Sequence, residues 1–266
     1  MKKCCIVDTT LRDGEQRPGS EWDYKQKIRA ACVLDQCGIP IIEGGIPAIG
    51  KTEQQAVYAM KNQCRKALIG TWNRIQKQDI DASLACEPDI IHLSIPVSIR
   101  QIYQKLGKNE DWTEKQAVWC AEYVQARGYT MTIGFEDASS ADMDFMVRLA
   151  KRLARYSVLF FRFADTLGKL VPHQTCTYIK QLHEQAAVPV GFHGHNDLGM
   201  VIANSLSAIQ GGASFIDTTI LGIGERTGNC PLGKFMQSAG ETFSFSQAID
   251  SIKAERECRE ILHIDL

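Results

Sequence analysis

The sequence lacks the features by which several large classes of protein are recognised. Its 266 residues contain no block of lysine and arginine and carry a formal net charge of −1, so the electrostatic footprint of most nucleic-acid binders is missing. No uninterrupted apolar run reaches the roughly 18 residues of a membrane-spanning helix, and charge comes too early at the N-terminus for a signal peptide. We therefore expect a cytoplasmic protein that has neither nucleic acid nor a membrane as a partner.

Cysteine is plentiful, but its spacing excludes the usual structural uses of cysteine. The ten cysteines are scattered over the whole chain and form no C-x-x-C pair, which argues against a zinc ribbon or finger. They also lack the dense framework of a small disulfide-rich domain. We expect reduced thiols.

Short apolar runs recur along the chain, and each is followed by a longer stretch with helical periodicity, which is typical of repeated β-α units. The runs are continuous rather than alternating, so both faces of the strands should be covered. Eight units in 266 residues predict an α/β fold of the (β/α)8 TIM-barrel class. The predicted strands are residues 4–8, 40–45, 66–71, 89–94, 130–135, 157–163, 188–193 and 214–218. The predicted helices are residues 23–37, 52–65, 77–86, 111–127, 141–155, 172–185, 199–211 and 232–243.

Two parts of unequal size are expected. Residues 1–246 form the catalytic barrel, and residues 247–266 form a helical extension with an amphipathic stretch at 251–261. This extension is either a packed terminal helix or the truncated start of a further subdomain.

A pair of histidines at the end of the seventh strand suggests a metal site. His193 and His195 are two residues apart, so in an extended chain both side chains point to one face. Asp13 follows the first strand, and only the eighth strand separates the first from the seventh around a barrel. These three residues predict a site with two histidines, one carboxylate and open positions, which suits zinc, manganese or magnesium. Asn229, in the adjacent loop, is either an additional oxygen ligand or a turn residue.

Further polar residues lie near the predicted strand ends, where TIM barrels carry their active sites. Arg12 is placed to polarise a substrate carbonyl and stabilise an enolate, or else forms an ordinary ion pair. Thr166 suits a substrate carboxylate, and Glu136 or His92 could orient or move a proton. The alternative for His92 is a buried side chain bonded to backbone.

Five motifs in order resemble those of the DRE-TIM metallolyase superfamily. This superfamily includes isopropylmalate, homocitrate and citramalate synthases, hydroxymethylglutaryl-CoA lyase and related aldolases. The resemblance covers nearly the whole chain. The motifs are DTTLRDGEQ at 8–16, FEDAS at 135–139, ADT at 164–166, HGHND at 193–197 and GERTGN at 224–229.

The resemblance implies roles for individual residues. The family's metal ligands would be Asp13, His193 and His195, with Asn229 near the metal as in the lyases. The family's catalytic arginine falls on Arg12, its accompanying glutamine on Gln16, and its ligand for the carboxylate of a 2-oxo acid on Thr166. The positions that match the lining of the family's substrate pocket are Glu43, His92 and Glu136.

Within the superfamily, residues 43–50 and 93–98 look most like homocitrate synthases of the nitrogen-fixation type. That resemblance implies a metal-dependent Claisen-type condensation of acetyl-CoA with a 2-oxo dicarboxylic or related 2-oxo acid, followed by thioester hydrolysis. The alternative is a carbon–carbon lyase of the hydroxymethylglutaryl-CoA lyase type. Cys230, directly after Asn229, keeps this alternative open because the lyases use a cysteine in a nearby loop.

The chain departs from the condensing members in two places. Those members carry a further helical region after the barrel, whereas this chain ends at Leu266. A homodimer or a complex with a complementing helical subunit is therefore expected, and the barrel could be one subunit of a split synthase. Ser140 stands where related synthases often have an arginine, which would change how the pocket holds a substrate or coenzyme.

Overall fold

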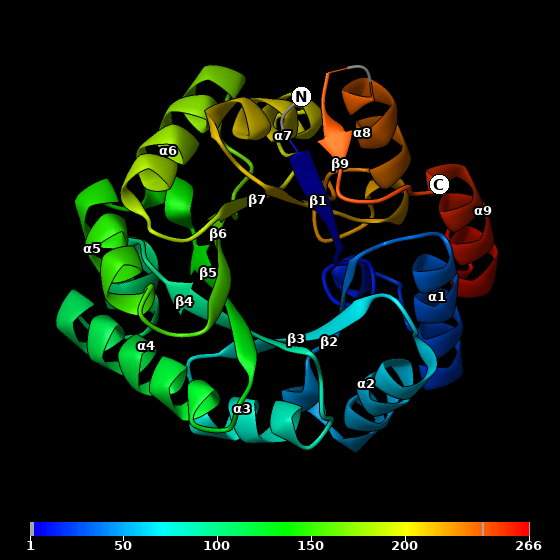
Figure 1. The fold of residues 1–266 in the computed structure, drawn as a ribbon, viewed down its shortest axis with the longest axis horizontal. Helices are drawn as coiled ribbons and strands as arrows, with labels where there is room; N and C mark the ends of the chain where they lie inside the picture. Colours follow the sequence, from blue (N-terminus) through cyan, green and yellow to red (C-terminus); the bar gives the residue numbers. More distant parts are fainter. Residues whose placement is uncertain (1–2, 241, 266) are drawn as a thin grey trace.

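Eight parallel strands close into a barrel in the computed structural model, which describes residues 3–240 and 242–265. The strands follow one another around the ring, and β1 pairs with both β8 and β2, so the sheet has no open edge between them (Figure 1). The predicted TIM barrel is confirmed. The strands are β1 Lys3–Asp8, β2 Ile41–Gly45, β3 Leu68–Arg74, β4 Ile90–Pro96, β5 Thr130–Glu136, β6 Val158–Asp165, β7 Val190–Gly194 and β8 Phe215–Thr218.

Helices form the outer ring and cover the barrel, which is why the strands are apolar on both faces. Helix α5 shows how the sequence specifies such a helix. Asp142 accepts a hydrogen bond from the Phe145 amide at 3.0 Å and caps the helix start, while Phe145, Leu149 and Leu153 are buried against the sheet. The helices are α1 Tyr24–Gln36, α2 Lys51–Gln63, α3 Lys77–Leu84, α4 Glu110–Gln125, α5 Met143–Leu153, α6 Pro172–Gln185, α7 Val201–Gly211, α8 Leu232–Ala239 and α9 Ser251–Leu262.

Short helical turns follow several strands and carry residues to the carboxyl end of the barrel. The sequence pattern did not reveal these turns, because each is too short to show periodicity. They are η1 Gly14–Gln16, η2 Pro47–Ile49, η3 Arg100–Lys105, η4 Ala138–Ser140 and η5 Ile220–Gly222.

The chain after α8 differs from the prediction. Helix α8 ends at Ala239, earlier than the predicted 243, and a two-residue strand, β9 Ser244–Phe245, pairs with β1 at Lys3 and Cys4. Helix α9 then lies against α1 on the outer ring (Figure 1), where Gln26 Nε2 donates to the Ile261 carbonyl at 2.9 Å. Residues 251–262 therefore form a packed helix. No helix among the described residues is long and apolar enough to span a bilayer.

Candidate metal centre and substrate cavity

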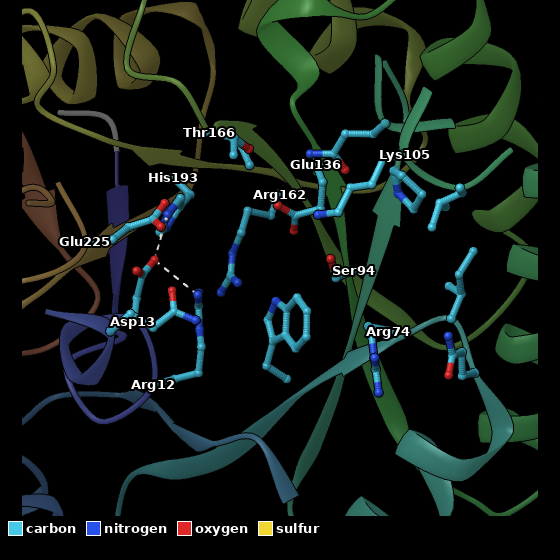
Figure 2. A pocket seen from close by; sticks show the side chains of 18 of the residues that line it. Arg12, Asp13, Arg74, Ser94, Lys105, Glu136, Arg162, Thr166, His193 and Glu225 are labelled. Atoms are coloured by element: carbon cyan, nitrogen blue, oxygen red, sulfur yellow. Dashed lines mark ion pairs between the residues drawn. The ribbon is translucent and has the colours of Figure 1, made fainter. Parts of the chain in front are cut away.

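A cavity of about 370 Å³ opens at the carboxyl ends of the strands. Its residues come from opposite sides of the ring: β1, β7 and β8 or their loops on one side, and β3, β4 and the turn η3 on the other (Figure 2). A concave site with few convergent polar groups is the usual form of a small-molecule site. The predicted site residues that line it are Arg12, Asp13, Gln16, Glu136, Thr166, His193 and His195.

Asp13, His193 and His195 form one buried cluster, and their ligand atoms all lie within 4.8 Å of one another. His193 Nε2 is 3.0 Å from Asp13 Oδ2 and 3.2 Å from His195 Nε2. Strand β7 ends at Gly194, so its extended backbone directs both imidazoles to the same point, as the spacing predicted. Figure 2 shows Asp13 reaching this point from the loop after β1.

The electrostatics of the cluster favour a positive charge at its centre. Burial alone would lower the pKa of His193, but its hydrogen bonds with Asp13 and Asp217 raise that pKa to about 9. Burial and the neighbouring His193 charge lower the pKa of His195 to about 3. Burial opposes ionisation of Asp13, yet Arg12 and His193 hold the pKa of this carboxyl well below its usual range. The cluster therefore accommodates a single cation between its two imidazoles and its carboxylate.

Unsatisfied oxygens at the same place also fit a divalent ion. Asp13 Oδ1 and Asn229 Oδ1 are buried and have no hydrogen-bond partner among the described residues. Asn229 pairs with His195 through an isolated antiparallel bridge, and its Nδ2 donates to the Ile223 carbonyl at 3.1 Å. Gly224 makes room for this amide, because a Cβ there would lie 2.0 Å from Asn229 Nδ2. The mixed nitrogen and oxygen donors suit zinc, manganese or magnesium.

Arg12 lies between the metal cluster and a buried carboxylate. Its Nη1 is 3.1 Å from Asp13 Oδ2, and its Nε donates to Glu43 Oε2 at 2.5 Å. Burial opposes ionisation of Glu43, but the charges of Arg12 and Arg162 hold the pKa of this carboxyl well below its usual range. Both oxygens of Glu43 are occupied, because Arg162 Nη1 donates to Oε1 at 2.9 Å.

A second carboxylate orients His193 from behind. His193 Nδ1 lies 2.9 Å from Asp217 Oδ2, which turns Nε2 toward Asp13. Such a carboxylate behind a ligating histidine fixes the tautomer and the ring orientation. Arg162 Nε forms an ion pair with the same Asp217 oxygen at 2.8 Å. Arg162 and Asp217 lie within β6 and β8, away from the polar residues that follow the strand ends, and the sequence pattern did not predict a role for either.

Glu43, His92 and Asn229 do not line the cavity as it stands. His92 lies beneath the floor, where its Nδ1 contacts Thr132 Oγ1 at 2.8 Å and its Nε2 contacts Arg162 Nη1 at 3.3 Å. Burial and the Arg162 charge lower the pKa of His92 well below the usual imidazole value, so this side chain is neutral. Its partners are side chains and not the backbone. The predicted contacts of Glu43 and His92 with substrate stay predictions.

Arg226 ties together the loops that follow β6, β7 and β8. It donates to the Thr166 carbonyl at 2.7 Å, to Asp197 Oδ1 at 2.9 Å, and forms an ion pair with Glu225. Arg226 adopts a left-handed φ of 51°, which is uncommon for a residue with a side chain. The ion pair with Arg226 holds Glu225 at the open side of the cavity, where Glu225 Oε1 is 4.0 Å from His195 Nε2.

Cys230 does not lie on the cavity that the predicted site residues line. The thiol belongs to the hydrophobic core, is fully buried and does not line the cavity. Burial raises its pKa to about 12, so a thiolate is not available near pH 7. The lyase alternative loses the cysteine on which it was based.

The chain resembles known proteins over nearly its whole length. A family model described as HMGL-like matches residues 3–254. The homocitrate synthase subunit alpha of Clostridium pasteurianum is 37% identical over 98% of both chains. The 2-isopropylmalate synthase 2 of Caldanaerobacter subterraneus subsp. tengcongensis is 35% identical over 94% of this chain, which spans 65% of that longer protein.

Solved structures with much lower sequence identity share the fold. The hydroxymethylglutaryl-CoA lyase of Bacillus subtilis superposes with a TM-score of 0.85 and covers 100% of this chain and 96% of its own. Only 17% of the aligned residues are identical. This similarity supports the barrel and carries no statement about activity.

Proposed function

We propose that this chain, which belongs to the HMGL-like family, catalyses a metal-dependent condensation of acetyl-CoA with a 2-oxo acid. In this reaction the acyl methyl group loses a proton and its carbon attacks the ketone carbon of the 2-oxo acid. Water then hydrolyses the thioester and releases the coenzyme A thiol. The matched synthases are named for different products, so the proposal covers 2-oxo acids as a class, with homocitrate synthesis as the first to test.

The observation that carries the proposal is the buried Asp13–His193–His195 cluster at the bottom of an open cavity, with Arg12 beside it. These three residues would hold the metal, and Asn229 Oδ1 is a further candidate ligand. A bound divalent ion would act as a Lewis acid toward the ketone oxygen and as a template for the 2-oxo acid. The cavity leaves that side of the cluster accessible to a substrate.

Arg12 is assigned to the ketone oxygen, where negative charge develops as the new bond forms. Its guanidinium lines the cavity and is already fixed by Glu43 and Asp13, so no reorientation is needed during reaction. Fixed charge aimed at a developing oxyanion is usually the largest catalytic contribution. Thr166 and Gln16, also on the lining, are assigned to the carboxylate of the 2-oxo acid.

Glu136 is assigned to proton transfer at the acyl methyl carbon. It ends β5 and lines the cavity between the metal cluster and the turn η3. Burial raises the pKa of Glu136 above the ordinary carboxyl value, although His193 and Arg12 oppose this effect. A carboxylate of raised pKa is a stronger base, which is what removal of a carbon-bound proton requires.

The side of the cavity opposite the metal cluster is assigned to the acyl-CoA. It is lined by Trp72, Trp112, Leu106 and Lys105, which offer apolar surface and one ammonium group. Lys105 has no ion pair or hydrogen bond among the described residues, whereas Arg74, also on the lining, is paired with Asp79 at 2.7 Å. Figure 2 shows Lys105 and Arg74 on the far side of the cavity from Asp13 and His193.

The test is production of free coenzyme A from acetyl-CoA in the presence of a panel of 2-oxo acids, with zinc, manganese or magnesium added. Chromatography of coenzyme A is preferable to a thiol reagent because the chain itself has ten cysteines. We expect release with at least one acceptor and none with His193→Ala. The proposal would be contradicted if coenzyme A were released no faster with any of the 2-oxo acids than without an acceptor.

A second form of the proposal is that the chain is one subunit of a split synthase. It is favoured by the full-length match to a protein named as the alpha subunit of homocitrate synthase. The partner would supply helical structure that longer synthases carry after the barrel. If the chain alone binds metal and 2-oxo acid but releases no coenzyme A, adding the product of a neighbouring gene should restore release. Full activity of the isolated chain would rule this form out.

A further inference from the structure

We infer that Arg162 is the positioning residue that holds both carboxylates behind the metal cluster, and so fixes His193 through Asp217 and Arg12 through Glu43. This inference rests on the proposed metal site and deepens it. Arg162 is buried, with 2% of its surface exposed, and lies in the middle of β6. Its side chain also lines the cavity, but its polar contacts among the described residues are with Glu43, Asp217 and His92.

One edge of the guanidinium lies next to Asp217, in an ion pair without an aligned hydrogen bond. Arg162 Nε is 2.8 Å from Asp217 Oδ2, and the same oxygen is 2.9 Å from His193 Nδ1. No other arginine or lysine of the described chain pairs with Asp217. Asp217 thus lies between the imidazole of His193 and the guanidinium of Arg162, and Arg162 is the cation that accompanies this buried carboxylate.

The other edge faces Glu43. Arg162 Nη1 donates to Glu43 Oε1 at 2.9 Å, while Arg12 Nε donates to Glu43 Oε2 at 2.5 Å. Arg12 in turn is 3.1 Å from Asp13 Oδ2. The series of contacts closes at His193, because Asp13 Oδ2 is 3.0 Å from His193 Nε2. A closed ring results, made of Asp13, Arg12, Glu43, Arg162, Asp217 and His193.

Both strands next to β6 carry a glycine at the position beside Arg162. In the strand register, Arg162 lies beside Gly134 of β5 and beside Gly191 of β7. A Cβ at Gly134 would lie 2.6 Å from His92 Nε2, the ring atom that contacts Arg162 Nη1. A Cβ at Gly191 would lie 3.0 Å from both Phe160 and Phe215. Gly134 thus makes room for the His92 ring that contacts Arg162, and Gly191 makes room for two phenylalanines of the barrel interior.

A planar guanidinium is suited to this position, because its separate nitrogens can bind two carboxylates at fixed angles. Lysine has a single charged nitrogen and could not reproduce the contacts of both Nε and Nη1. The ring therefore depends on Arg162 for its connection between the β2 side, which holds Glu43, and the β8 side, which holds Asp217.

The test is cobalt(II) binding, measured by chelator competition and by the visible absorption of the bound ion. The variants are Arg162→Gln, Asp217→Asn and their double variant. We expect each single variant to bind cobalt roughly 10- to 100-fold more weakly, the usual effect of losing an outer-shell partner, with a shifted absorption band. If Arg162 acts through Asp217, adding Arg162→Gln to Asp217→Asn should weaken binding less than threefold.

Arg162→Gln leaves two buried carboxylates with one cation fewer and could fail to fold. A second comparison, of Glu43→Gln with Glu43→Gln/Arg162→Gln, keeps the inference testable if Arg162→Gln does not fold. The Glu43→Gln/Arg162→Gln variant loses one negative and one positive charge together, so its buried charges stay balanced. The double variant should again bind cobalt at least tenfold more weakly than Glu43→Gln alone. Arg148→Gln, on the exposed face of α5, is the matched control and should bind like the wild type.

The inference would be overturned if Arg162→Gln bound cobalt with the affinity and absorption of the wild type. It would also be overturned if Glu43→Gln/Arg162→Gln bound cobalt as tightly as Glu43→Gln alone. A third contradicting result would be a loss of cobalt affinity in the Arg162→Gln/Asp217→Asn double variant that equals the product of the two single losses. Failure of the wild-type chain itself to bind cobalt would instead refute the metal site on which the proposed function rests. The two failures are therefore distinguishable.

Discussion

His193 illustrates how much of the candidate centre depends on single side chains. Its Nε2 faces Asp13 and His195 only because Nδ1 is held by Asp217 at 2.9 Å. Arg12 is held in the same way by Glu43. The residues that would touch substrate are thus fixed by residues that would not, and this arrangement lets the charged groups keep their geometry without substrate.

Glu136→Gln should separate proton transfer from metal binding. The amide keeps the size of the side chain but cannot accept a proton from carbon, so we expect the rate of coenzyme A release to fall by roughly 10²- to 10⁴-fold. Metal content should not change, because Glu136 is not part of the Asp13–His193–His195 cluster. Turnover within a few-fold of the wild type would remove Glu136 from the proposed mechanism.

Asp8 should make the stability of the fold depend on pH. Burial raises its pKa to about 7, although its hydrogen bonds with Thr10 oppose this effect. The folded chain therefore holds a proton that the unfolded chain has lost, so the free energy of unfolding should fall as pH rises from about 4 to about 7. The difference is on the order of 4 kcal/mol at most.

Asp8→Asn removes this titration and keeps an oxygen that can accept from the Thr10 amide. Urea unfolding at several pH values should show that the variant loses less stability than the wild type between pH 4 and 7. Equal pH dependence in the two proteins would show that Asp8 does not titrate in this range.

Among the elements, the loops that build the site are tied to the helices outside the barrel. Lys27 of α1 is almost fully buried and bonds Glu15 at 2.8 Å and both oxygens of Glu53 at 2.7 Å. Glu15 belongs to η1, next to Gln16 of the cavity, and Glu53 also accepts from the Ile46 amide after β2. One lysine thus connects the loops that follow β1 and β2.

Lys27→Met should leave two carboxylates without their cation in a buried place. We expect a loss of roughly 3–5 kcal/mol in the free energy of unfolding, measured by urea denaturation. Lys25→Met, on the exposed face of the same helix, should change stability by less than about 0.5 kcal/mol. Similar stability of both variants would mean that the Lys27 contacts are not important to the fold.

The sequence pattern revealed the long elements and the strand-end residues, and it missed what has no pattern. The eight strands were predictable because a parallel barrel needs continuous apolar runs. Asp13, His193 and His195 were predictable because the ends of its strands meet at one face. The two-residue β9 and the short turns had too few residues to show periodicity.

Arg162 and Asp217 were missed for a different reason. Both lie inside strands, and their importance depends on which strands face each other across the barrel. The available signal was a charged residue within an otherwise apolar run, with glycine at Gly134 and Gly191 on the neighbouring strands. Glu43 and His92 were recognised as polar residues near the site, but their burial beneath the floor required coordinates.

At the scale of the whole molecule, closure of the barrel brings together residues that are far apart in the chain, such as Asp13 and His193, whose Oδ2 and Nε2 atoms are 3.0 Å apart. Helix α9 packs on α1, and Glu255 of α9 accepts from the Gly233 amide at 2.8 Å, so the residues after the eighth helix are part of the same packed structure. Whether residues 247–266 also begin a further subdomain stays a prediction. The candidate metal cluster does not depend on it, because Asp13, His193 and His195 all belong to the barrel.

The most direct test of the account is the metal content of the purified chain by elemental analysis after loading with zinc or manganese and removal of excess metal. The wild type and His173→Ala, which alters an exposed histidine of α6, should retain close to a single ion per chain. Asp13→Ala and His193→Ala should retain almost none while keeping the wild-type circular dichroism spectrum. Full retention in both of these variants would contradict the assignment of the metal centre.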